Sequence, residues 1–447
     1  MLSLPAVLVA VFGMLWIVTP LQAYAGTLKA LVGGVLIDGT GAAPLNNSVI
    51  LIDGERIVAV GKEGAIVIPD AAQIISTAGL TVLPGLWDLS VHLSRLGHLD
   101  SRHWDELYLP LADRVVMPIA AKQLLQSGVT SARDIASPLG AALSVRERIN
   151  AQRIPGPTLY VGGPALDKKA TGLTHSYRWS IQGAMDAQQK AQRLANAGVD
   201  YLLVTNPAAL SSSELDAIAR VAYDSGIPWH AEIFGDDDIT VALAHNAAGL
   251  LGVGLDLHPS LPAAAAIALG ARAASNTTVP WVAGASLLTN YSWLRHNLSA
   301  LDALPWNDGL PAIVTDDIRT SLNAIHNTDA VALAAERRAV VGSRLASARA
   351  MGARLLVGSD SGMPGHFHTR AVAQEIDALV TEAGLSPLEA IRAATLDAAR
   401  FMKAANDNGS IETGKYADII AVKGDVLQRI SALHDIEFVM RHGLRQR

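Results

Sequence analysis

The sequence predicts an α/β protein in which a (β/α)8 TIM-like barrel lies beside a small β-sandwich built from both chain termini. Three observations support this fold class. The chain has 447 residues, enough for one large domain and a smaller one. Short apolar runs alternate with Ala-rich helical stretches through its middle, which indicates parallel strands joined by right-handed crossovers. Strand-like segments with turn signals occupy both ends.

The first element is a segment without charge. Residues 1–26 carry no Lys, Arg, Asp or Glu, and an apolar run over residues 6–18 precedes the stretch "LQAYAG". Ala23 and Ala25 supply the small residues of a signal-peptidase site. We therefore expect residues 1–25 to be a cleaved signal peptide and the protein to be exported, either periplasmic or extracellular. An uncleaved membrane anchor through the same residues is the alternative.

The next element is expected to pack with the last one. Within residues 26–82, the stretch "NNSVILIDGERIVAVG" is typical of a hairpin with Asp53 and Gly54 at its turn. Residues 409–447 contain similar strand-like stretches, "GKYADIIAV" and "DIEFVMRHG". Because neither segment could bury its apolar face alone, the sequence predicts that the two form one β-sandwich.

Residues 83–408, between these segments, predict the barrel. The runs "GVTSARD", "VDYLLVTN", "IPWHAEIF" and "ARLLVGSD" each follow a helical stretch, and each carries polar residues at or near its end. In (β/α)8 barrels the C-terminal ends of the strands carry the active site. The polar residues at these ends are therefore the candidates for function.

Composition narrows the classes of partner. The formal net charge of −6 gives no basic face for nucleic acid. The chain has no cysteine, which excludes disulfides and Cys-ligated zinc. We expect a small-molecule substrate or ligand, no nucleic acid, and contact with a membrane only during export or through the N-terminal segment. A homo-oligomer is left open.

Six motifs in order give the chain a family resemblance. They are "GVLIDGTG", "LPGLWD", "GVTSARD", "GSDSG", "GLSPLEAIRAATLDAAR" and "GSIETGKYADIIAV". Together they resemble the amidohydrolase superfamily, and within it the imidazolonepropionase-like and prolidase-like secreted members. The resemblance implies a (β/α)8 barrel and hydrolysis of amide or related C–N bonds other than ordinary peptide-bond proteolysis.

The resemblance also implies a metal site. The family's ligands are a His-x-His pair on strand one, a carboxylated Lys on strand four, one His each on strands five and six, and an Asp on strand eight. Residue-by-residue matching retains only His92 and Asp360. The other four positions hold Ser90, Leu203, Glu232 and Leu255.

These replacements argue against the family's two-metal centre. Leu203 has no lone pair and cannot replace a carboxylated lysine that bridges two ions. A single divalent ion, with zinc as the expected metal, remains open because three protein ligands and a water can hold it. His230 joins the candidates because it lies two residues before Glu232 and alternate strand residues face the same side. We expect at most one weakly held metal, with candidate ligands His92, His230, Glu232 and Asp360.

Each candidate also has a purely structural interpretation. Asp360 and His92 are the expected catalytic residues, but Asp360 could instead bond the amides of a tight turn, and His92 could be a hydrogen-bonded barrel histidine. Ser90 is expected to be a small polar pocket residue, since a nucleophilic serine needs an adjacent base. Glu232 is a metal ligand, a pocket residue or the partner of Arg133.

The resemblance also implies substrate contacts for other polar residues. His175 lies where the resemblance implies a substrate loop, and His368 follows strand eight, where a solvated helix start is its alternative. His258 would become a ligand if strand six carried a three-residue insertion. The expected substrate-binding residues are Ser90, Arg133, His175, His258 and His368.

The sequence leaves more than one class of function open. The family resemblance favours an amidohydrolase-type hydrolase with at most a one-metal site. The lost ligand positions favour a catalytically inactive relative, in which the barrel is a binding or scaffold protein. A metal-free acid–base enzyme that uses Asp360 and His92 is a third interpretation. We adopt the hydrolase as the working prediction.

Overall fold

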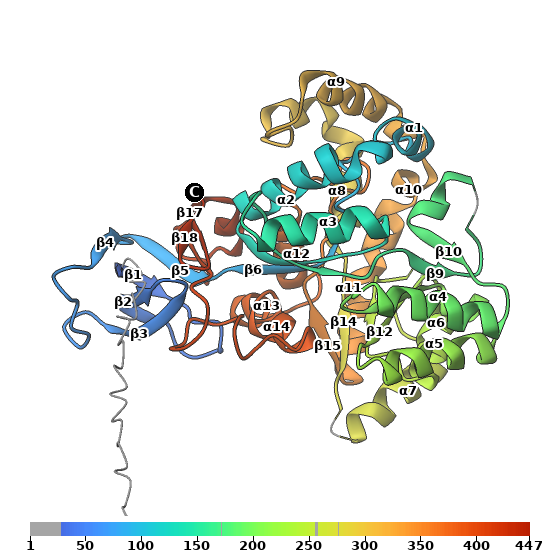
Figure 1. Cartoon of the computed structure of the whole chain (residues 1–447), viewed down its shortest axis with the longest axis horizontal. Helices are drawn as coiled ribbons and strands as arrows, with labels where there is room; N and C mark the ends of the chain where they lie inside the picture. The colour runs from blue at the N-terminus through green and yellow to red at the C-terminus, as the bar shows by residue number, and fades with distance from the viewer. Residues whose placement is uncertain (1–27, 171, 255–257, 276) are drawn as a thin grey trace, which may run out of the picture.

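The computed structural model describes residues 28–170, 172–254, 258–275 and 277–447 (Figure 1). It shows an α/β fold with one mixed sheet on one side and parallel strands packed among helices on the other. The expected signal peptide lies outside the described residues, so its removal stays a prediction. Within the described ranges, no helix has the length and apolarity needed to span a membrane.

Both ends of the chain contribute to the mixed sheet, which we call the terminal sheet. Its strand order is β18-β17-β16-β5-β1-β2-β3, with β4 also paired with β1. The termini meet where β5 pairs antiparallel with β16, with Val82 opposite Ala421. The strands are β1 (Lys29–Leu36), β2 (Leu45–Asp53), β3 (Arg56–Lys62), β4 (Gln73–Ser76), β5 (Leu80–Pro84), β16 (Ile419–Lys423), β17 (Ile436–Arg441) and β18 (Leu444–Arg445).

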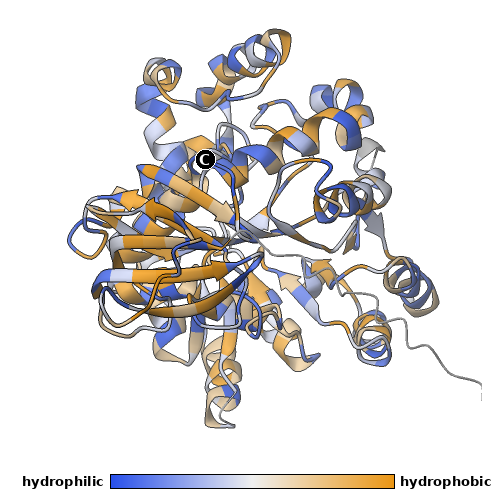
Figure 2. Cartoon of the chain, turned by 60° about the vertical axis from the view of Figure 1, so that its left-hand side comes forward, coloured by the Kyte–Doolittle hydropathy of each residue, from blue (hydrophilic) through white to orange (hydrophobic). Residues whose placement is uncertain are grey.

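The terminal sheet has one apolar core to which both termini contribute. Ile57 of β3 packs in the same cluster as Phe438 of β17, although these strands lie near opposite ends of the strand order. The Ile57 N–H also donates to the Lys415 carbonyl at 2.9 Å. In Figure 2 much of the length of these strands is orange, the colour of hydrophobic residues. The pairing defines a single sheet, so the predicted sandwich is not confirmed, and the domain boundaries stay predictions.

The parallel strands of the middle region form two sheets. One has the order β6-β7-β8 and the other the order β10-β9-β11-β12-β13-β14-β15. Their bounds are β6 (Leu86–Val91), β7 (Val129–Asp134), β8 (Thr158–Val161), β9 (Ala165–Asp167), β10 (Arg178–Ser180), β11 (Leu202–Thr205), β12 (Trp229–Glu232), β13 (Gly249–Leu251), β14 (Val279–Val282) and β15 (Ala353–Leu356).

Isolated backbone hydrogen bonds join the two parallel sheets at both edges, and several of them lie between β6 and the segment after β15. The Asp200 N–H donates to the Val161 carbonyl at 2.8 Å, which connects the start of β11 to β8. The Leu89 N–H of β6 donates to the Val357 carbonyl just after β15 at 3.1 Å. A TIM-like barrel has this same order of neighbouring strands. Here, however, regular strand pairing is interrupted between β8 and β11 and between β6 and β15. The α/β class with parallel strands is confirmed, whereas a continuously closed barrel is not seen.

Helices pack around the parallel strands (Figure 1). In α4 the buried residues Ala187, Ala191 and Leu194 recur at helical spacing and give the helix one apolar face. The helices are α1 (Ser101–Leu107), α2 (Met117–Gln126), α3 (Leu139–Asn150), α4 (Ala184–Asn196), α5 (Ser212–Asp224), α6 (Asp236–Ala244), α7 (Ala263–Ala274), α8 (Ser286–Asn297), α9 (Ala312–Ser321), α10 (Asp329–Ala332), α11 (Ala334–Ala350), α12 (Ala371–Thr381), α13 (Pro387–Ala393) and α14 (Leu396–Phe401).

Candidate active site

Four of the predicted residues lie at the C-terminal ends of parallel strands. Ser90 belongs to β6 and His92 follows it, Glu232 ends β12, and Asp360 follows β15. Ser90 is fully buried, whereas His92, Glu232 and Asp360 are each partly exposed. The three partly exposed side chains are therefore the ones that a small molecule could reach from this edge.

Asp360 is held twice by Ser90. Its backbone N–H donates to the Ser90 carbonyl at 2.8 Å, and the Ser90 hydroxyl donates to Asp360 Oδ1. The backbone of Asp360 has a φ of 57°, in the left-handed region that Asp adopts more readily than most residues. Burial, opposed in part by the hydrogen bond from Ser90 and aided by the nearby carboxylate of Glu232, raises the pKa of Asp360 to about 7. The carboxylate is thus fixed in direction and close to its titration point at neutral pH.

A second carboxylate lies deeper along β6. Asp88 accepts hydrogen bonds from the Ser359 hydroxyl at 2.5 Å, from the Ser359 N–H at 2.8 Å and from the Ser90 N–H at 3.2 Å. Burial raises its pKa to about 6. Asp88 is not among the residues that the sequence singled out. The sequence pattern that could have identified Asp88 is strand alternation, because residues 88, 90 and 92 then lie on one face of the strand.

Arg133 extends from β7 through the interior to β12. Its Nε donates to the Leu89 carbonyl at 2.6 Å and its Nη1 donates to His230 Nδ1 at 2.8 Å. Because arginine can only donate, His230 Nδ1 accepts and the proton of this ring lies on Nε2. The ring of Tyr201 stacks on His230 with a centroid distance of 5.1 Å. Both Arg133 and His230 are fully buried, so a positive charge lies in the interior.

A pairing between Glu232 and Arg133, one of the alternatives for Glu232, is replaced by other contacts. Arg133 bonds His230, whereas Glu232 Oε2 accepts the hydroxyl of Thr205 from β11 at 2.8 Å. The negative charge of Glu232 still acts on Arg133 at longer range. Burial lowers the pKa of the guanidinium, and the charge of Glu232 opposes this change. Arg133 thus acts on this edge through its charge and through His230.

Comparison with known proteins identifies the fold around these residues. The sequence model of the amidohydrolase family matches residues 81–444, most of the chain. The chain belongs to the amidohydrolase family. The resemblance that the motifs gave is therefore confirmed at the level of the family.

Individual relatives of this amidohydrolase share less sequence. Ochratoxinase from Aspergillus niger is 34% identical over 143 residues, which cover 31% of this chain and only 28% of that protein. The solved structure of a protein described as a prolidase from Bifidobacterium longum matches with a TM-score of 0.72 at 21% identity, covering 94% of this chain and 95% of the other. That of molinate hydrolase matches with a TM-score of 0.73 at 17% identity, with coverages of 94% and 95%. At these identities the structures show a common fold.

Amidohydrolases usually bind metal, and the side chains here can be tested for that role. Leu203, at the carboxylated-lysine position, is fully buried and offers no donor atom. Leu255 lies outside the described residues. The Nδ1 of His230 already accepts a hydrogen bond from Arg133, whose charge would repel a cation placed beside it.

The ligand atoms at this edge also lie too far apart as a group. Among the described residues, three or more His, Asp or Glu side chains bring one ligand atom each within 4.8 Å of one another only at His98, His103 and Asp317. Those residues belong to the region of α1 and α9 of this amidohydrolase. The side chains at the strand ends therefore do not fit a metal in the arrangement seen. The predicted metal ligands are among these side chains, namely His92, His230, Glu232 and Asp360.

His92 is less suited than Asp360 to transferring protons. Burial and the charge of Arg95 lower its pKa to about 3, so the ring is neutral and weakly basic at pH 7. A group that transfers protons works best when its pKa lies near the working pH. Of the two expected catalytic residues of this amidohydrolase, Asp360 is therefore the better candidate, and His92 is a neutral polar group at the edge of the site.

His368 is a structural residue in this arrangement. Its Nε2 donates to the Arg95 carbonyl at 3.0 Å, so Nδ1 accepts the Ser361 hydroxyl at 2.7 Å. The side chain is buried, and it joins the segment after β15 to the segment after β6. The alternative of a solvated helix start is therefore wrong for His368. Neither ring nitrogen is left for a substrate.

We expect His368→Gln to reduce the acid sensitivity of folding. Burial lowers the folded-state pKa of His368 from 6.5 to about 4, so the unfolded chain binds this proton first and stability is lost as the pH falls below 6.5. His368 should lower the free energy of unfolding of the wild type by about 2.5 kcal/mol between pH 7.5 and pH 4.5. Urea unfolding of both proteins at the two pH values measures it. An equal loss in wild type and variant would contradict the assignment.

The other two expected substrate contacts are exposed. His175 lies in a short 3-10 helix, Gly172–Ser176, beside β10. His258 follows the undescribed residues 255–257, and its carbonyl accepts Arg344 Nη1 at 3.4 Å. Nothing brings either side chain to Asp360 in the described contacts, so their contact with substrate stays a prediction.

Proposed function

We propose that this protein is an amidohydrolase that hydrolyses an amide or related C–N bond of a small molecule, with Asp360 as the group that transfers the proton. The observation that carries the proposal is the double attachment of Asp360 to Ser90 at a partly exposed strand end. An aspartate of purely structural use would direct both oxygens into the protein. Here Ser90 occupies Oδ1, and the residue as a whole is partly exposed at the strand end.

The proposed reaction uses water and the residues described. The Asp360 carboxylate takes a proton from a water molecule as the water oxygen attacks the carbonyl carbon of the substrate. The C–N bond then breaks, and the proton passes from Asp360 to the leaving nitrogen, which regenerates the carboxylate. Ser90 keeps the carboxylate in one direction throughout. The buried charge of Arg133 offsets the clustered negative charges of Asp360, Asp88 and Glu232.

A cavity beside Glu232 offers room for the substrate. Its volume is about 320 Å³, and its lining includes Thr205, Phe234, Lys168 and Arg178. Thr205 also bonds Glu232, so the cavity adjoins the candidate site. A volume of this order suits a small molecule. Arg178 is paired with Asp167, which also lines the cavity, and Lys168 is paired with Glu214.

The experiment that tests the proposal is a hydrolysis panel with the purified full chain. Amides, esters and lactones of small acids are incubated with the protein, and the products are quantified by mass spectrometry. Hydrolysis of at least one amide that requires Asp360 supports the proposal. Absence of hydrolysis across the panel, together with saturable ligand binding, supports the second candidate, a binding protein. The replaced ligand positions, Ser90 and Leu203 among them, are the observation that favours this candidate.

Export is proposed on the sequence of residues 1–26 alone. The mature chain is expected to begin at Gly26, because Ala23 and Ala25 precede it in a cleavage pattern. N-terminal sequencing of protein from the extracytoplasmic fraction checks this. Recovery of intact Met1 in a membrane fraction would indicate an anchor, and recovery from the cytoplasm would contradict both forms of the proposal.

A further inference from the structure

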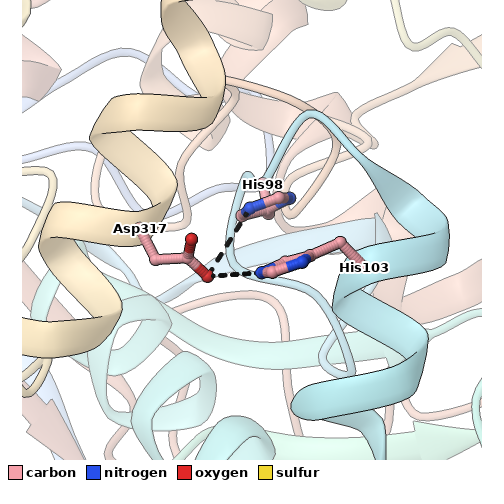
Figure 3. A group of neighbouring side chains, drawn as sticks. All are labelled: His98, His103 and Asp317. Carbon is pink, nitrogen blue, oxygen red and sulfur yellow. Dashed lines mark hydrogen bonds and ion pairs between the residues drawn. The ribbon is translucent and has the colours of Figure 1, made fainter.

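Two histidines and an aspartate converge where α1 meets α9 (Figure 3). His98 precedes α1 and His103 lies in its first turn, while Asp317 lies in α9. His103 Nε2 is 2.9 Å from Asp317 Oδ2, and His98 Nε2 is 3.7 Å from the same oxygen. The two imidazole rings lie nearly parallel, with a centroid distance of 5.0 Å. The three donor atoms therefore surround one small space.

The spacing of these atoms matches the demands of a transition-metal ion. With metal–ligand distances near 2.0–2.1 Å, tetrahedral geometry places neighbouring donors about 3.3 Å apart. The two measured distances of 2.9 and 3.7 Å bracket that value. Shifts of a few tenths of an ångström would bring His98, His103 and Asp317 to a common ion. Rotations of partly exposed side chains can supply such shifts.

The ring of His98 is anchored to the backbone of Asp100. Its Nδ1 lies 3.0 Å from both the N–H and the carbonyl of Asp100. The N–H donates to Nδ1, which leaves the proton of the neutral ring on Nε2, 3.7 Å from the Asp317 carboxylate. An ion bound by Nε2 would take the place of that proton, and the Asp100 carbonyl offers an acceptor if the proton moves to Nδ1. A backbone-anchored imidazole is the usual arrangement for metal-binding histidines.

The rest of the group is open enough to admit an ion. The side chain of His98 is 3% exposed, while those of His103 and Asp317 are 39% and 29% exposed. Tyr108 donates its hydroxyl to Asp317 Oδ2 at 2.8 Å and orients the carboxylate. A fourth coordination position is therefore left for water on the exposed side.

We propose that His98, His103 and Asp317 bind one divalent transition-metal ion, with zinc as the expected metal, and that this ion fastens α9 to the start of α1. The imidazole and carboxylate donors suit zinc, and the single negative charge of Asp317 partly neutralises it. The site is separate from Asp360 and does not rest on the proposed hydrolysis.

The consequence of this site lies in what α1 supports. On α1, Asp105 accepts Arg95 Nη2 at 3.2 Å and the Tyr177 hydroxyl at 2.8 Å. Arg95 belongs to the segment that follows His92, and its carbonyl also anchors His368. An ion that fixes α1 therefore steadies the segment next to the candidate active site without touching the substrate.

The test is metal binding by the full chain after treatment with a chelator. Zn²⁺ is titrated by calorimetry, and thermal unfolding is followed with and without Zn²⁺. Wild type is expected to bind one equivalent with a raised Tm. His103→Gln and Asp317→Asn should each weaken binding at least about tenfold and remove the Tm increase. His326→Gln, at an exposed histidine five residues after the end of α9, is the matched control and should behave as wild type.

Further arms make the outcome decisive. His103 is partly exposed, so His103→Gln is expected to fold, and its far-UV circular dichroism should equal that of wild type. Asp360→Asn should bind Zn²⁺ as wild type does, whatever its effect on hydrolysis. The proposal is overturned if wild type binds no Zn²⁺, if binding survives in both ligand variants, or if Asp360→Asn abolishes it.

Discussion

Asp360→Asn should reduce kcat/KM for any amide that the protein hydrolyses by at least roughly 100-fold, the usual contribution of a general base. The amide keeps the size of the side chain and can still accept the Ser90 hydroxyl bond, but it cannot take a proton from water. Since burial raises the pKa of Asp360 to about 7, the ionised form is disfavoured by its surroundings. The neutral variant should therefore be as stable as wild type at pH 8, and the loss should be one of chemistry.

The measurement pairs kinetics with thermal unfolding. Asp237→Asn is the control, because Asp237 is an exposed aspartate of α6. It makes the same chemical change away from the strand ends and should leave kcat/KM within a factor of about two, as surface substitutions usually do. Hydrolysis that persists in Asp360→Asn within threefold of wild type would remove Asp360 from the mechanism and leave another group to be found.

Arg133→Met should lower the free energy of unfolding by about 3–5 kcal/mol, the usual result of removing one partner from a buried charge network. The substitution leaves the Leu89 carbonyl and His230 Nδ1 without the donors that they have now. It also removes the positive charge that counters Asp360, Asp88 and Glu232. Methionine fills much of the same volume as arginine. The lower free energy of unfolding therefore measures the lost hydrogen bonds and charge more than a cavity.

Urea unfolding at pH 7.5 measures this change. Arg153→Met, at an exposed arginine, is the matched control and should alter stability by less than about 0.5 kcal/mol. Arg133→Lys adds a second comparison, because it keeps the charge but cannot direct two donors from one plane. A loss below 1 kcal/mol in Arg133→Met would show that the guanidinium is not the stabilising partner that its contacts indicate.

The sequence predicted the elements better than it predicted their contacts. Apolar periodicity located strands such as β7, β12 and β15, and the turn at Asp53 and Gly54 marks the β2–β3 hairpin that the structure contains. Ser90 and Asp360 were both expected at strand ends, since motif order and strand alternation determine those places. Such patterns are local, so they can be recognised from the spacing of residues within short segments of the chain.

Contacts between distant strands follow from rotamers and register, which local patterns do not contain. The bond from Arg133 to His230 spans 97 residues, whereas the sequence offered Glu232 as one possible partner of Arg133. His103 and Asp317 are 214 residues apart, so only the placement of α9 beside α1 brings them together. For the same reason the sequence could name candidate metal ligands at the strand ends but could not show whether their donor atoms converge.

The pairing of β5 with β16 also has a consequence for how this chain acquires its structure. Val82 and Ala421 are partners across more than three hundred intervening residues, so the terminal sheet has a very high contact order. During synthesis the edge of β5 stays without its partner until almost the whole polypeptide has been made. An unpaired apolar edge of this kind invites intermolecular association. Slow completion of this sheet, with aggregation as its competitor, is the expected bottleneck when the protein is refolded at high concentration.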